Sequence, residues 1–585
     1  MGGIGGAPAP NHGLAIVQDG ERWLRLEAPE RVLLAFSADE VRPALDALDA
    51  ATRNGLWAAG FLCYEAAAAF GFSVRPPREG LPLVWFGLYH DAAETAVPAV
   101  GAEAAAPVGP WTPALDGVAH ARALEALQEH IGGGDTYQVN FTFPLRAEFR
   151  ADPWAFFRSL RQVQRSGNAA YLDTGRFVVC SVSPELFFRW EGEGLVTRPM
   201  KGTAARGRTA AEDEAFGRRL AASEKDRAEN LMIVDMLRND LGRVALTGSV
   251  SVTGLFAVER YPTLLQMTST VTARTSAGIS EILAALFPCA SVTGAPKART
   301  MQIIAETETA PRGVYAGAVG IVGPGRWASF NVAIRTAVVD RERGEAFYGV
   351  GSGIVADSDP AGEYSECLLK ARVLAEPPFR LLETMRWTPE GGFFLEEEHL
   401  ARLLASAAHF GAALHRTRVW GELHDLARRL VGPSRVRLLV DLDGGIELSA
   451  TPLEAVAPAP ARVALSREAI DDSSPWLFHK TTRREVYDAA LAAHPGVDEV
   501  ILWNRRGEVT EGCRYNVVVD RGHGPLTPPV SCGLLAGTFR GHLLAAGRVR
   551  EEVVTVAELR GTRAFSLVNS VAEWREATWA EGDRP

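Results

Sequence analysis

The chain has 585 residues, enough for about four compact domains or for fewer and larger ones. Its 61 basic and 71 acidic side chains give a net charge of −10, which lacks the basic excess of non-specific nucleic-acid binding but leaves a small anionic substrate open. With 47% hydrophobic and 23% charged residues, the composition excludes wholesale disorder.

The N-terminal residues, MGGIGGAPAPNHG, have neither the basic nor the apolar part of a signal peptide, and no run of 18 apolar residues occurs. We therefore expect a soluble, cytoplasmic protein with a frayed start and with neither a membrane nor a nucleic-acid partner. The six cysteines form no C-x-x-C pair, which favours reduced, buried thiols over a zinc site.

Changes in composition divide the chain. Residues 92–113, rich in Ala, Pro and Gly, predict a linker between an N-terminal lobe (1–91) and a catalytic core (114–375), which together form a first domain over 1–375. The prolines of LAEPPFR, residues 374–380, end a helical pattern, and a second domain is predicted over 381–585. A Pro/Ala stretch at 452–462 has the length of a connection between two lobes of that domain. Runs such as RFVVCSV, AGAVGIVG and VAIRTAVV alternate with helical patterns, so both domains are predicted to be α+β.

Lysine is rare, and the few lysines are candidates for chemistry. The chain has only Lys201, Lys225, Lys297, Lys370 and Lys480, so 56 of its 61 basic residues are arginine. Compositional drift explains the missing lysines, because either cation serves on a solvated surface. Arginine cannot replace a lysine that must lose its proton to act as a nucleophile or as a Schiff-base amine.

Two predicted helices carry carboxylates. The helix over 223–243 places Asp226 and Glu229 three residues apart on one face. A second helix begins at Asp359 and Pro360, an N-cap followed by proline, and carries Glu363 and Glu366 together with Lys370 on one face. Such oxygen ligands suit Mg²⁺, although surface salt bridges explain the same spacing.

Eight ordered segments across residues 115–372 resemble the chorismate-utilising enzymes. They are IGGGDTYQVN (131–140), SPELF (183–187), PMKGT (199–203), EKDRAEN, LRNDLGR, SVTGAPKART (291–300), AIRT (333–336) and GSGIVADSDPAGEYSECLLKA (351–371). The resemblance implies an antiparallel β-sandwich with flanking helices that binds chorismate and Mg²⁺. In this family, lysine in the PxKGT segment, here Lys201, marks the aminodeoxychorismate synthases, whereas anthranilate synthases usually have alanine. Gln266, where many members have histidine, argues further against anthranilate chemistry.

The resemblance also implies roles for single residues. Lys201 is the nucleophile that adds at C2 of chorismate while the C4 hydroxyl leaves, and Glu185 is the acid that protonates this hydroxyl, although a lone glutamate at a strand end is also explained by a salt bridge. The implied Mg²⁺ ligands are Glu229, Glu363 and Glu366. The implied substrate-binding residues are Tyr315 and Arg335, which grip a carboxylate, Thr293, Lys297 and Lys370, and the close backbone of Gly351 to Gly353.

From residue 381 onward, a second set of segments resembles the two-lobed class IV pyridoxal-phosphate aminotransferases. They are LLETMRW, HLARLLASA (399–407), FHKTTRREVY (478–487), GEVTEGCRYNVVV (507–519), GLLAGTFR (533–540) and LVNSV (567–571). By this resemblance Lys480 bonds pyridoxal 5′-phosphate, Glu511 pairs with its ring nitrogen and Arg402 binds its phosphate. The other implied cofactor contacts are Gly537, Thr538 and Phe539 at a helix N-terminus, and Ser570. Ala572 stands where the resemblance leads us to expect an arginine for the substrate carboxylate.

Together the two resemblances imply a bifunctional enzyme. Chorismate is aminated to 4-amino-4-deoxychorismate, and pyridoxal phosphate-dependent elimination of pyruvate then gives 4-aminobenzoate for folate synthesis. The chain has no G-x-C-x-G nucleophile motif, so ammonia is expected from a separate glutamine amidotransferase subunit. A homodimer through the C-terminal domain is a further expectation. Two alternatives stay open: an anthranilate-type synthase fused to an unrelated aminotransferase, and a synthase whose C-terminal domain is not catalytic.

Overall fold

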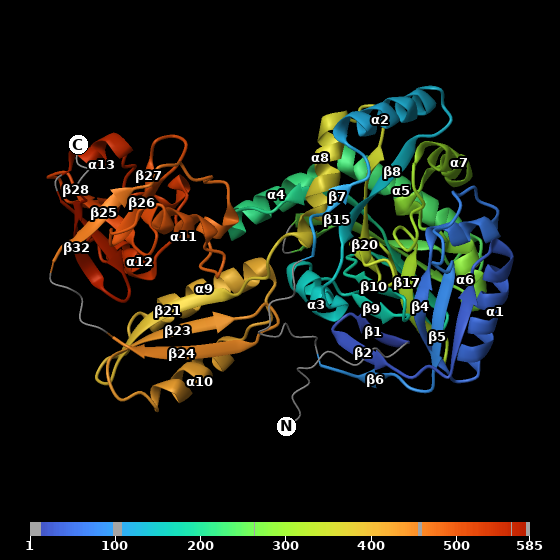
Figure 1. Ribbon diagram of the computed structural model, residues 1–585, viewed down its shortest axis with the longest axis horizontal. Helices are drawn as coiled ribbons and strands as arrows, with labels where there is room; N and C mark the ends of the chain where they lie inside the picture. Colours follow the sequence, from blue (N-terminus) through green and yellow to red (C-terminus); the bar gives the residue numbers. More distant parts are fainter. Residues whose placement is uncertain (1–12, 97–107, 262–263, 454–458, 563, 581–585) are drawn as a thin grey trace. The chain divides into compact units, whose positions relative to one another are not determined.

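The structure, a computed structural model, describes residues 13–96, 108–261, 264–453, 459–562 and 564–580. Their contacts divide the chain into two compact units (Figure 1). Unit 1 holds the described residues of Met1–Ala205 and Gly217–Pro378, and unit 2 holds those of Arg206–Phe216 and Phe379–Pro585. Parts of the predicted frayed start (1–12), of the predicted linker (97–107) and of the Pro/Ala stretch (454–458) lie outside the described residues. Both units combine helices with sheets, which confirms the α+β prediction.

Unit 1 is built on two antiparallel sheets, each with ten strands among the described residues. In sheet A the order is β16 (Gly294–Ala295), β8 (Gln138–Glu148), β20 (Glu345–Ile354), β19 (Thr336–Asp340), β10 (Phe177–Ser181), β9 (Ala170–Asp173), β1 (Leu14–Asp19), β2 (Arg22–Leu26) and β6 (Ala93–Glu94), and β7 (Thr112–Pro113) pairs with β8. In sheet B the order is β13 (Met200–Ala205), β15 (Leu264–Arg274), β12 (Gly194–Arg198), β11 (Leu186–Glu191), β18 (Trp327–Val332), β17 (Ala318–Gly323), β4 (Trp57–Leu62), β5 (Val84–Tyr89) and β3 (Arg31–Ala35), and β14 (Ser251–Arg260) pairs with β15.

Strand β10 shows why an apolar run becomes a central strand. Phe177 and Val179 join the core that both sheets share, whereas Val178 and Cys180 pack on the opposite side with helix α3 (Pro153–Val163). Because alternate side chains of a strand point to opposite faces, a continuous apolar run fits a strand that is covered on both sides. The predicted strands RFVVCSV, AGAVGIVG and VAIRTAVV correspond to β10, β17 and β19.

Residues 14–94 contribute strands to both sheets. β1 pairs with β9 in sheet A, and β4 pairs with β17 in sheet B. This region therefore shares the core of the sandwich and does not stand apart as the lobe that we expected from composition. Composition carries no information on which strands pair, so it did not indicate this arrangement.

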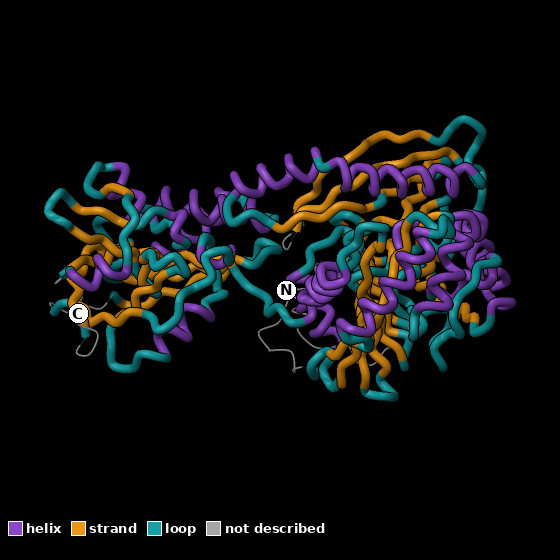
Figure 2. Tube along the Cα trace, turned by 90° about the horizontal axis from the view of Figure 1, so that it is seen from above, coloured by secondary structure: helices purple, strands orange, loops and turns teal. Residues whose placement is uncertain are grey.

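Helices pack around the sheets, and Figure 2 shows the strands of unit 1 lying between helices. The helices are α1 (Ala38–Arg53), α2 (Gly117–Gly132), α3, α5 (Glu224–Gly242), α6 (Ile279–Leu286), α7 (Lys297–Thr307) and α8 (Pro360–Ala371), with short 3₁₀ turns η1 (Tyr64–Phe70), η2 (Ala290–Val292) and η3 (Arg372–Leu374). Helices α1 and α6 bury apolar side chains in the core that both sheets share. Helix α3 and the turn η3 do so on the outer face of sheet A.

The two helices with predicted carboxylates begin at capping residues. The Ser223 hydroxyl accepts a hydrogen bond from the Asp226 backbone N–H (3.3 Å) at the start of α5. Asp359 accepts one from the Gly362 N–H (2.7 Å) at the start of α8, whose first residue is Pro360. These caps satisfy backbone donors that have no partner in the first turn, and they confirm both predicted helices.

Unit 2 contains two further sheets with separate hydrophobic cores, in agreement with a two-lobed domain. Sheet C is antiparallel and has the order β22 (Gly392–Phe393), β21 (Leu381–Thr388), β23 (Ser434–Val440) and β24 (Ile446–Pro452). Sheet D is mixed and has the order β27 (Val509–Gly512), β26 (Glu499–Trp503), β25 (Ala461–Leu465), β32 (Glu573–Trp579), β31 (Phe565–Asn569), β28 (Asn516–Asp520), β29 (Pro525–Thr527) and β30 (Arg550–Glu551).

The helices of unit 2 cover these sheets. They are α9 (Glu396–Phe410), α10 (Arg416–Ala427), α11 (Glu485–Ala492), α12 (Thr538–Ala545) and α13 (Val556–Gly561), with 3₁₀ turns η4 (Pro475–Leu477) and η5 (Val530–Cys532). Helices α9 and α10 pack on sheet C, and α12 packs against β28 and β31 of sheet D. Unit 2 also includes Arg206–Phe216, the segment that directly follows β13 and in which α4 (Ala210–Ala222) begins.

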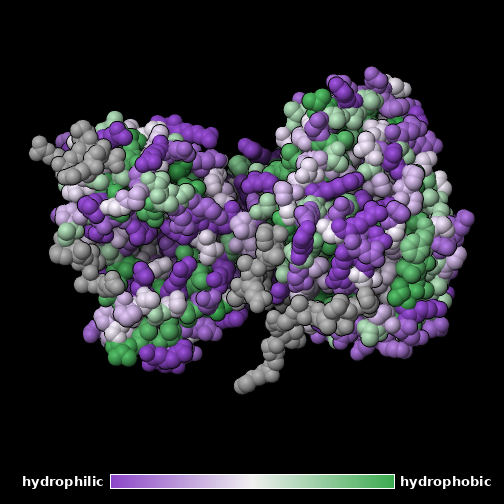
Figure 3. Space-filling view, in the orientation of Figure 1, coloured by the Kyte–Doolittle hydropathy of each residue, from purple (hydrophilic) through white to green (hydrophobic). Residues whose placement is uncertain are grey.

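The surface is mostly hydrophilic or mixed on the face shown in Figure 3. Three of the exposed large apolar side chains, Val32, Leu34 and Phe36, lie in and just after the edge strand β3. All six cysteines are buried with free thiols, as expected from their scattered positions. Among the described helices, none is long and apolar enough to cross a membrane.

Candidate active sites

In unit 1, Lys201 on β13 meets a carboxylate and a glycine. Its Nζ is 3.3 Å from Oε2 of Glu229 on α5, and the two side chains are 19% and 18% exposed. A Cβ at Gly353 on β20 would lie 2.3 Å from Lys201 Nζ and 2.5 Å from Gln138 Nε2. Glycine at this position leaves room for both side chains. The fold thus brings together Lys201, Glu229 and Gly353, and it adds Gln138, which sequence reasoning missed.

Two side-chain amides hold the backbone carbonyls of Lys201 and Gly202. Asn230 donates from Nδ2 to the Lys201 carbonyl (3.2 Å) and accepts from the Ser269 hydroxyl (2.5 Å). Gln266 donates from Nε2 to the Gly202 carbonyl (2.8 Å). Asn230 was also missed. Like Gln138, it is a polar side chain that the fold buries almost completely, and this burial cannot be read from the residue type alone.

Glu185 precedes β11 and is buried near Lys201. Burial raises the pKa of its carboxyl to about 7, while the Ser291 hydroxyl, the Met200 backbone N–H and the Lys201 charge limit this rise. Within the described part of the chain, Oε1 of Glu185 has no hydrogen-bond partner. A carboxyl that is about half protonated near neutral pH can give a proton to a leaving group.

The three predicted metal ligands are each engaged by another group. Besides the contact between Glu229 and Lys201, Glu366 Oε1 is 2.7 Å from Lys370 Nζ, and Glu363 Oε1 accepts a hydrogen bond from Ser358 (2.7 Å). No three His, Cys, Asp or Glu side chains among the described residues are grouped so that they could hold a metal ion. The carboxylate donors suit Mg²⁺ in their chemistry, but they would have to leave these partners to share an ion.

The other predicted substrate residues near α8 form a connected set. Lys370 donates from Nζ to the Gly351 carbonyl (2.8 Å), and Arg335 donates from Nη1 to the Lys370 carbonyl (3.0 Å). Arg335 has a positive φ of 49°, which a non-glycine residue adopts at a cost. Its guanidinium also faces the Tyr348 hydroxyl, although burial still raises the pKa of this hydroxyl to about 12. These contacts fix Arg335 between β20 and α8.

Thr293 and Lys297 are bound to protein groups. The Thr293 hydroxyl donates to the carbonyls of Cys289 and Ala290, at 3.3 and 3.1 Å, and the side chain is fully buried. Lys297 Nζ is 2.6 Å from Asp240 Oδ2 and donates to the carbonyls of Leu286 and Pro288, at 3.4 and 2.9 Å. All three donors of the ammonium group are therefore directed to protein acceptors.

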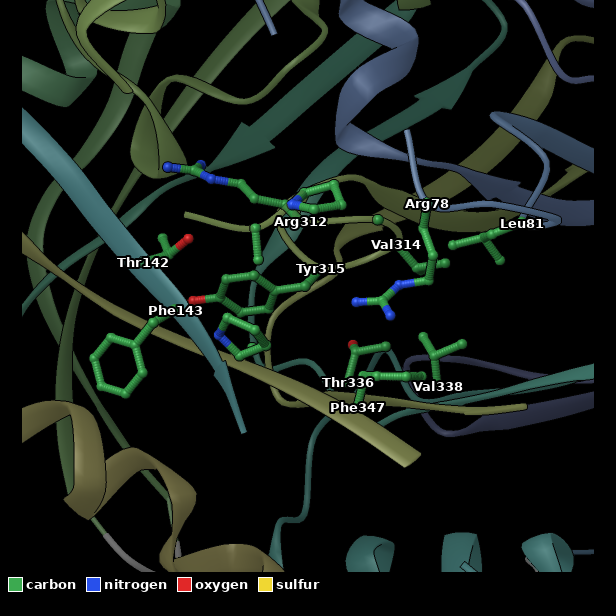
Figure 4. Close-up of a pocket in the computed structure, with 15 residues that line it drawn as sticks. Arg78, Leu81, Thr142, Phe143, Arg312, Val314, Tyr315, Thr336, Val338 and Phe347 are labelled. Atoms are coloured by element: carbon green, nitrogen blue, oxygen red, sulfur yellow. The ribbon is translucent and has the colours of Figure 1, made fainter. Parts of the chain in front are cut away.

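Tyr315 is packed against β20. A Cβ at Gly349 would lie 2.1 Å from Tyr315 Cγ, so the ring occupies the space of a missing side chain. Burial raises the pKa of the Tyr315 hydroxyl well above its ordinary value. With Arg78 and Phe347 it lines a cavity of about 30 Å³, in which its hydroxyl points toward Thr142 (Figure 4). That volume holds one or two water molecules and no ring-sized ligand.

A buried ion pair anchors the segment that leads to Tyr315. Arg312 Nη2 is 2.7 Å from Glu308 Oε1, and the two side chains are 2% and 3% exposed. Arg312 also donates to the carbonyls of Val292 and Asn140, both at 2.7 Å, and its backbone N–H donates to Glu65 (2.7 Å). These bonds join the turn η1, the strand β8 and the segment before Tyr315.

In unit 2, Lys480 is the centre of the second candidate site. Burial lowers the pKa of its amine to about 8, and the charges of Arg402 and Arg484 act in the same direction. The carboxylates of Glu383 and Glu511 oppose this shift. Its backbone carbonyl accepts a hydrogen bond from the Leu382 N–H (3.0 Å), which ties Lys480 to the start of β21. A neutral amine is accessible at mildly basic pH, as a nucleophile or base requires.

Glu511 on β27 receives three hydrogen bonds. The Tyr487 hydroxyl (2.8 Å) and the Leu535 backbone N–H (3.1 Å) donate to Oε1, and Asn516 Nδ2 (3.3 Å) donates to Oε2. Burial raises the pKa of the Glu511 carboxyl to about 7, against the hydrogen bonds from Tyr487 and Leu535 and the charges of Lys480 and Arg484. The donors orient the carboxylate, and Tyr487 and Asn516 were not anticipated from the sequence.

Arg402 on α9 pairs with a buried carboxylate. Its Nε and Nη2 donate to the two oxygens of Glu383, at 2.8 and 2.6 Å, and His399 Nδ1 lies 2.7 Å from Glu383 Oε2. Although burial raises the pKa of Glu383, Arg402 and His399 lower it to about 2. Arg402 also donates from Nη1 to the Ala536 carbonyl (3.2 Å), so it lies next to the start of α12. Glu383 is a further residue that sequence reasoning missed.

The residues Gly537 to Phe539, predicted to contact the cofactor, form the closely packed N-terminus of α12. Gly537 is the N-cap, and a Cβ there would lie 1.9 Å from Asn516 Oδ1. The Thr538 hydroxyl lies 3.3 Å from His399 Nε2, and Phe539 is buried in the core beneath α12. Ser570 donates to the Thr384 carbonyl (3.5 Å). Unit 2 thus contains the groups that pyridoxal phosphate requires, namely an amine, an anion, a cation and a helix N-terminus.

Comparison with known proteins assigns both parts of the chain. Residues 14–376 match the model of the chorismate binding enzymes, and residues 380–578 match that of the class IV amino-transferases. The aminodeoxychorismate synthase of Streptomyces griseus is 46% identical over 266 residues, which are 45% of this chain and 36% of that protein. Anthranilate synthase component 1 of Streptomyces coelicolor is 41% identical over 268 residues, which are 45% of this chain and 52% of that protein. The chain thus spans about a third to a half of the length of these curated relatives.

A solved structure supports the fold of unit 1. The crystal structure of anthranilate synthase component I from Streptococcus pneumoniae TIGR4 aligns with a TM-score of 0.52 at 24% identity, over 64% of this chain and 94% of that chain. At this identity the match supports the sandwich architecture alone.

Proposed function

Because the chain belongs to the chorismate-binding enzyme family and carries a class IV amino-transferase domain, we propose that it converts chorismate to 4-aminobenzoate in two steps. Unit 1 would form 4-amino-4-deoxychorismate, and unit 2 would remove pyruvate from it. The observation that carries the proposal is the position of Lys201, whose amine lies 3.3 Å from Glu229 and near the buried carboxyl of Glu185.

In the first step, Lys201 acts as nucleophile and Glu185 as acid. The Lys201 amine bonds to C2 of chorismate, the ring double bonds shift, and the C4 hydroxyl leaves as water with a proton from Glu185. Ammonia then bonds to C4, the double bonds shift back, and the bond between C2 and Nζ breaks. This sequence returns the lysine amine and gives 4-amino-4-deoxychorismate.

The remaining predicted residues of unit 1 would bind the substrate. Glu229, Glu363 and Glu366 would hold Mg²⁺, which would supply positive charge for a substrate carboxylate. Arg335 would bind a carboxylate with its planar fork, in exchange for its present bond to the Lys370 carbonyl. The backbone of Gly351 and Gly353 would pass close to the ring.

In the second step, unit 2 would move one proton. Pyridoxal phosphate, once bound, supplies an electron sink for charge that forms at C4 of the substrate. Lys480 would take the C4 proton, Glu511 would face the ring nitrogen, and Arg402 with the N-terminus of α12 would bind the phosphate. The C3–O bond would then break, the ring would become aromatic, and the side chain would leave as enolpyruvate, which takes up one proton to become pyruvate.

Ammonia would come from a separate glutamine amidotransferase subunit, and the 4-aminobenzoate would serve folate synthesis. These 585 residues contain no G-x-C-x-G motif, so this stretch of sequence does not itself supply the glutaminase nucleophile. A relative named anthranilate synthase at 41% identity supports a second candidate for unit 1, the formation of 2-aminobenzoate. Lys201 argues against it, because a nucleophilic lysine would direct the amine to C4.

One incubation distinguishes these reactions. The purified chain is mixed with chorismate, Mg²⁺, ammonium and pyridoxal phosphate, and the aromatic products are separated and identified by mass spectrometry. We expect 4-aminobenzoate and pyruvate in equal amounts. Accumulated 4-amino-4-deoxychorismate would refute the activity of unit 2, and 2-aminobenzoate would refute the role of Lys201.

Two lysine variants provide the matched comparison. Lys201→Ala should lose amination, whereas Lys225→Ala should keep it, because Lys225 is an exposed residue at the start of α5. Equal rates of 4-amino-4-deoxychorismate formation by the two variants would contradict a nucleophilic Lys201.

A further inference from the structure

A segment that follows Lys201 in the sequence contains a buried ion pair of unit 2. Arg206 Nε donates to both oxygens of Asp213, at 3.0 and 2.9 Å, and Arg206 Nη2 also donates to the His409 carbonyl. The Arg206 and Asp213 side chains are 6% and 3% exposed, and the Gly207 N–H gives Asp213 a further hydrogen bond (2.6 Å). A buried pair whose hydrogen bonds are satisfied is held in one arrangement, unlike an ion pair on a solvated surface.

Two stacked histidines connect this ion pair to Lys480. Asp213 Oδ2 lies 3.6 Å from His409 Nδ1 on α9. The rings of His409 and His479 stack with their centroids 4.2 Å apart, and His479 Nδ1 lies 3.0 Å from the Ser406 hydroxyl. His479 directly precedes Lys480, so the position of its ring constrains the backbone of the lysine.

Arg208 also contacts residues close to Lys480. Its guanidinium lies 5.1 Å from the ring centroid of Phe478, and its Nη1 donates to the Asp472 carbonyl (3.4 Å). The backbone of Arg208 also contacts His479. The segment from Arg206 to Asp213 therefore packs on the residues that lead to Lys480.

We propose that the Arg206–Asp213 ion pair is a positioning element for Lys480. Both residues belong to unit 2, although they lie in the part of the sequence that matches the chorismate-binding family. The inference rests on the proposed function in one respect, namely that Lys480 is the reacting amine. The pair adds no net charge behind the histidine stack and fixes the backbone that carries the lysine. Removing one partner leaves an unpaired buried charge and releases the segment, whereas an uncharged pair of amides keeps it in place.

The titration of Lys480 reports this packing. Burial is the main cause of its lowered pKa, and the charged groups that face it are Arg402, Arg484, Glu383 and Glu511. Substitutions at 206 or 213 leave these four groups unchanged. Around His479, the facing charges are Arg206 and Asp213, which act in opposite directions on its pKa. Release of the segment would admit water to this stretch, so the pKa of Lys480 would rise.

The test is competitive acetylation of the full chain without cofactor or substrate. The chain is treated with acetic anhydride over a range of pH, and acetylation of Lys480 is compared with that of Lys225 by peptide mass spectrometry. Arg206→Gln and Asp213→Asn should each reduce the neutral fraction of Lys480 at pH 8, read from the pH midpoint of its acetylation profile, by about fivefold or more, because each unit of pKa is tenfold in neutral amine. The double variant should return to within about twofold of the original chain, as expected when both charges are removed together.

A matched control separates this effect from a general loss of charge. Arg428→Gln removes an ion pair with Asp425 in the same unit whose side chains are 78% and 62% exposed, and it should leave the Lys480 profile unchanged. The inference is overturned if the single variants keep the original acetylation profile of Lys480. It is also overturned if the profile of the double variant is shifted as far as those of the single variants. If a single variant does not fold, a folded double variant with the original profile supports the inference, and a displaced or unfolded one overturns it. Because no cofactor or substrate is used, failure of the proposed reaction would appear in the product assay alone.

Discussion

Replacing Gly353 by alanine should slow the proposed amination in unit 1 by roughly 100-fold and leave the fold of unit 1 intact. The added Cβ would lie 2.3 Å from Lys201 Nζ and 2.5 Å from Gln138 Nε2. Both atoms are the ends of flexible side chains, so they can retreat without moving the backbone. Van der Waals separation is about 3.5 Å, and Lys201 Nζ must therefore move by about 1 Å.

The displacement sets the size of the effect. A misplacement of about 1 Å at a reacting group costs roughly 100-fold in rate, equivalent to about 2.7 kcal/mol of transition-state stabilisation. The same change should also disturb the 3.3 Å contact between Lys201 and Glu229. Stability should fall by less than about 1 kcal/mol, because no backbone atom or buried ring opposes the methyl group.

The assay is the initial rate of 4-amino-4-deoxychorismate formation with ammonium as donor, together with urea unfolding. The control is Gly242→Ala at the end of α5, where no heavy atom lies within 4 Å of the added Cβ. A rate within about threefold of the original in Gly353→Ala would refute the argument that Lys201 acts from its present position. Unfolding of the variant would refute the argument that only flexible ends are displaced.

Three further predictions concern separate groups. Glu185→Gln should slow amination by about 100-fold or more. In the original chain, kcat/KM should fall as the pH rises through about 7, since the raised pKa of Glu185 keeps this proton donor protonated only below that pH. A flat pH profile would contradict the role of Glu185 as acid. Lys480→Ala should abolish the absorbance band of lysine-bound pyridoxal phosphate and pyruvate release, without changing 4-amino-4-deoxychorismate formation; a retained band would place the cofactor elsewhere. Arg312→Met leaves Glu308 buried without its cation and should cost about 3–5 kcal/mol in urea unfolding, and a loss below about 1 kcal/mol would show that the pair relaxes easily.

Local signals in the sequence predicted the elements that depend on neighbouring residues. Asp359 followed by Pro360 marked the start of α8, because a cap and the first helical residue act within one turn. The apolar run of β10 marked a strand buried on both sides. The resemblance between ordered motifs also anticipated that Lys201, Glu229 and Gly353 would meet, although they lie on three separate elements.

Contacts between distant residues were not accessible in this way. Gln138 reaches Gly353 only because β8 and β20 pair, and no local pattern records that pairing. Glu383 and Arg402 form a bidentate pair between β21 and α9, whereas the sequence suggested only the arginine. The packing of Arg206 in unit 2 was also unforeseen, since its motif context lies wholly within the other family.

The pairing of β4 with β17 has a consequence for synthesis on the ribosome. Gly60 pairs with Gly320, so at about 5–20 residues per second the edge of β4 waits roughly 13–50 s for its partner strand to be translated. During that time an apolar strand edge is open to pairing with other nascent chains. We expect newly made protein to depend on chaperones until β17 has emerged, and truncations before this strand to aggregate.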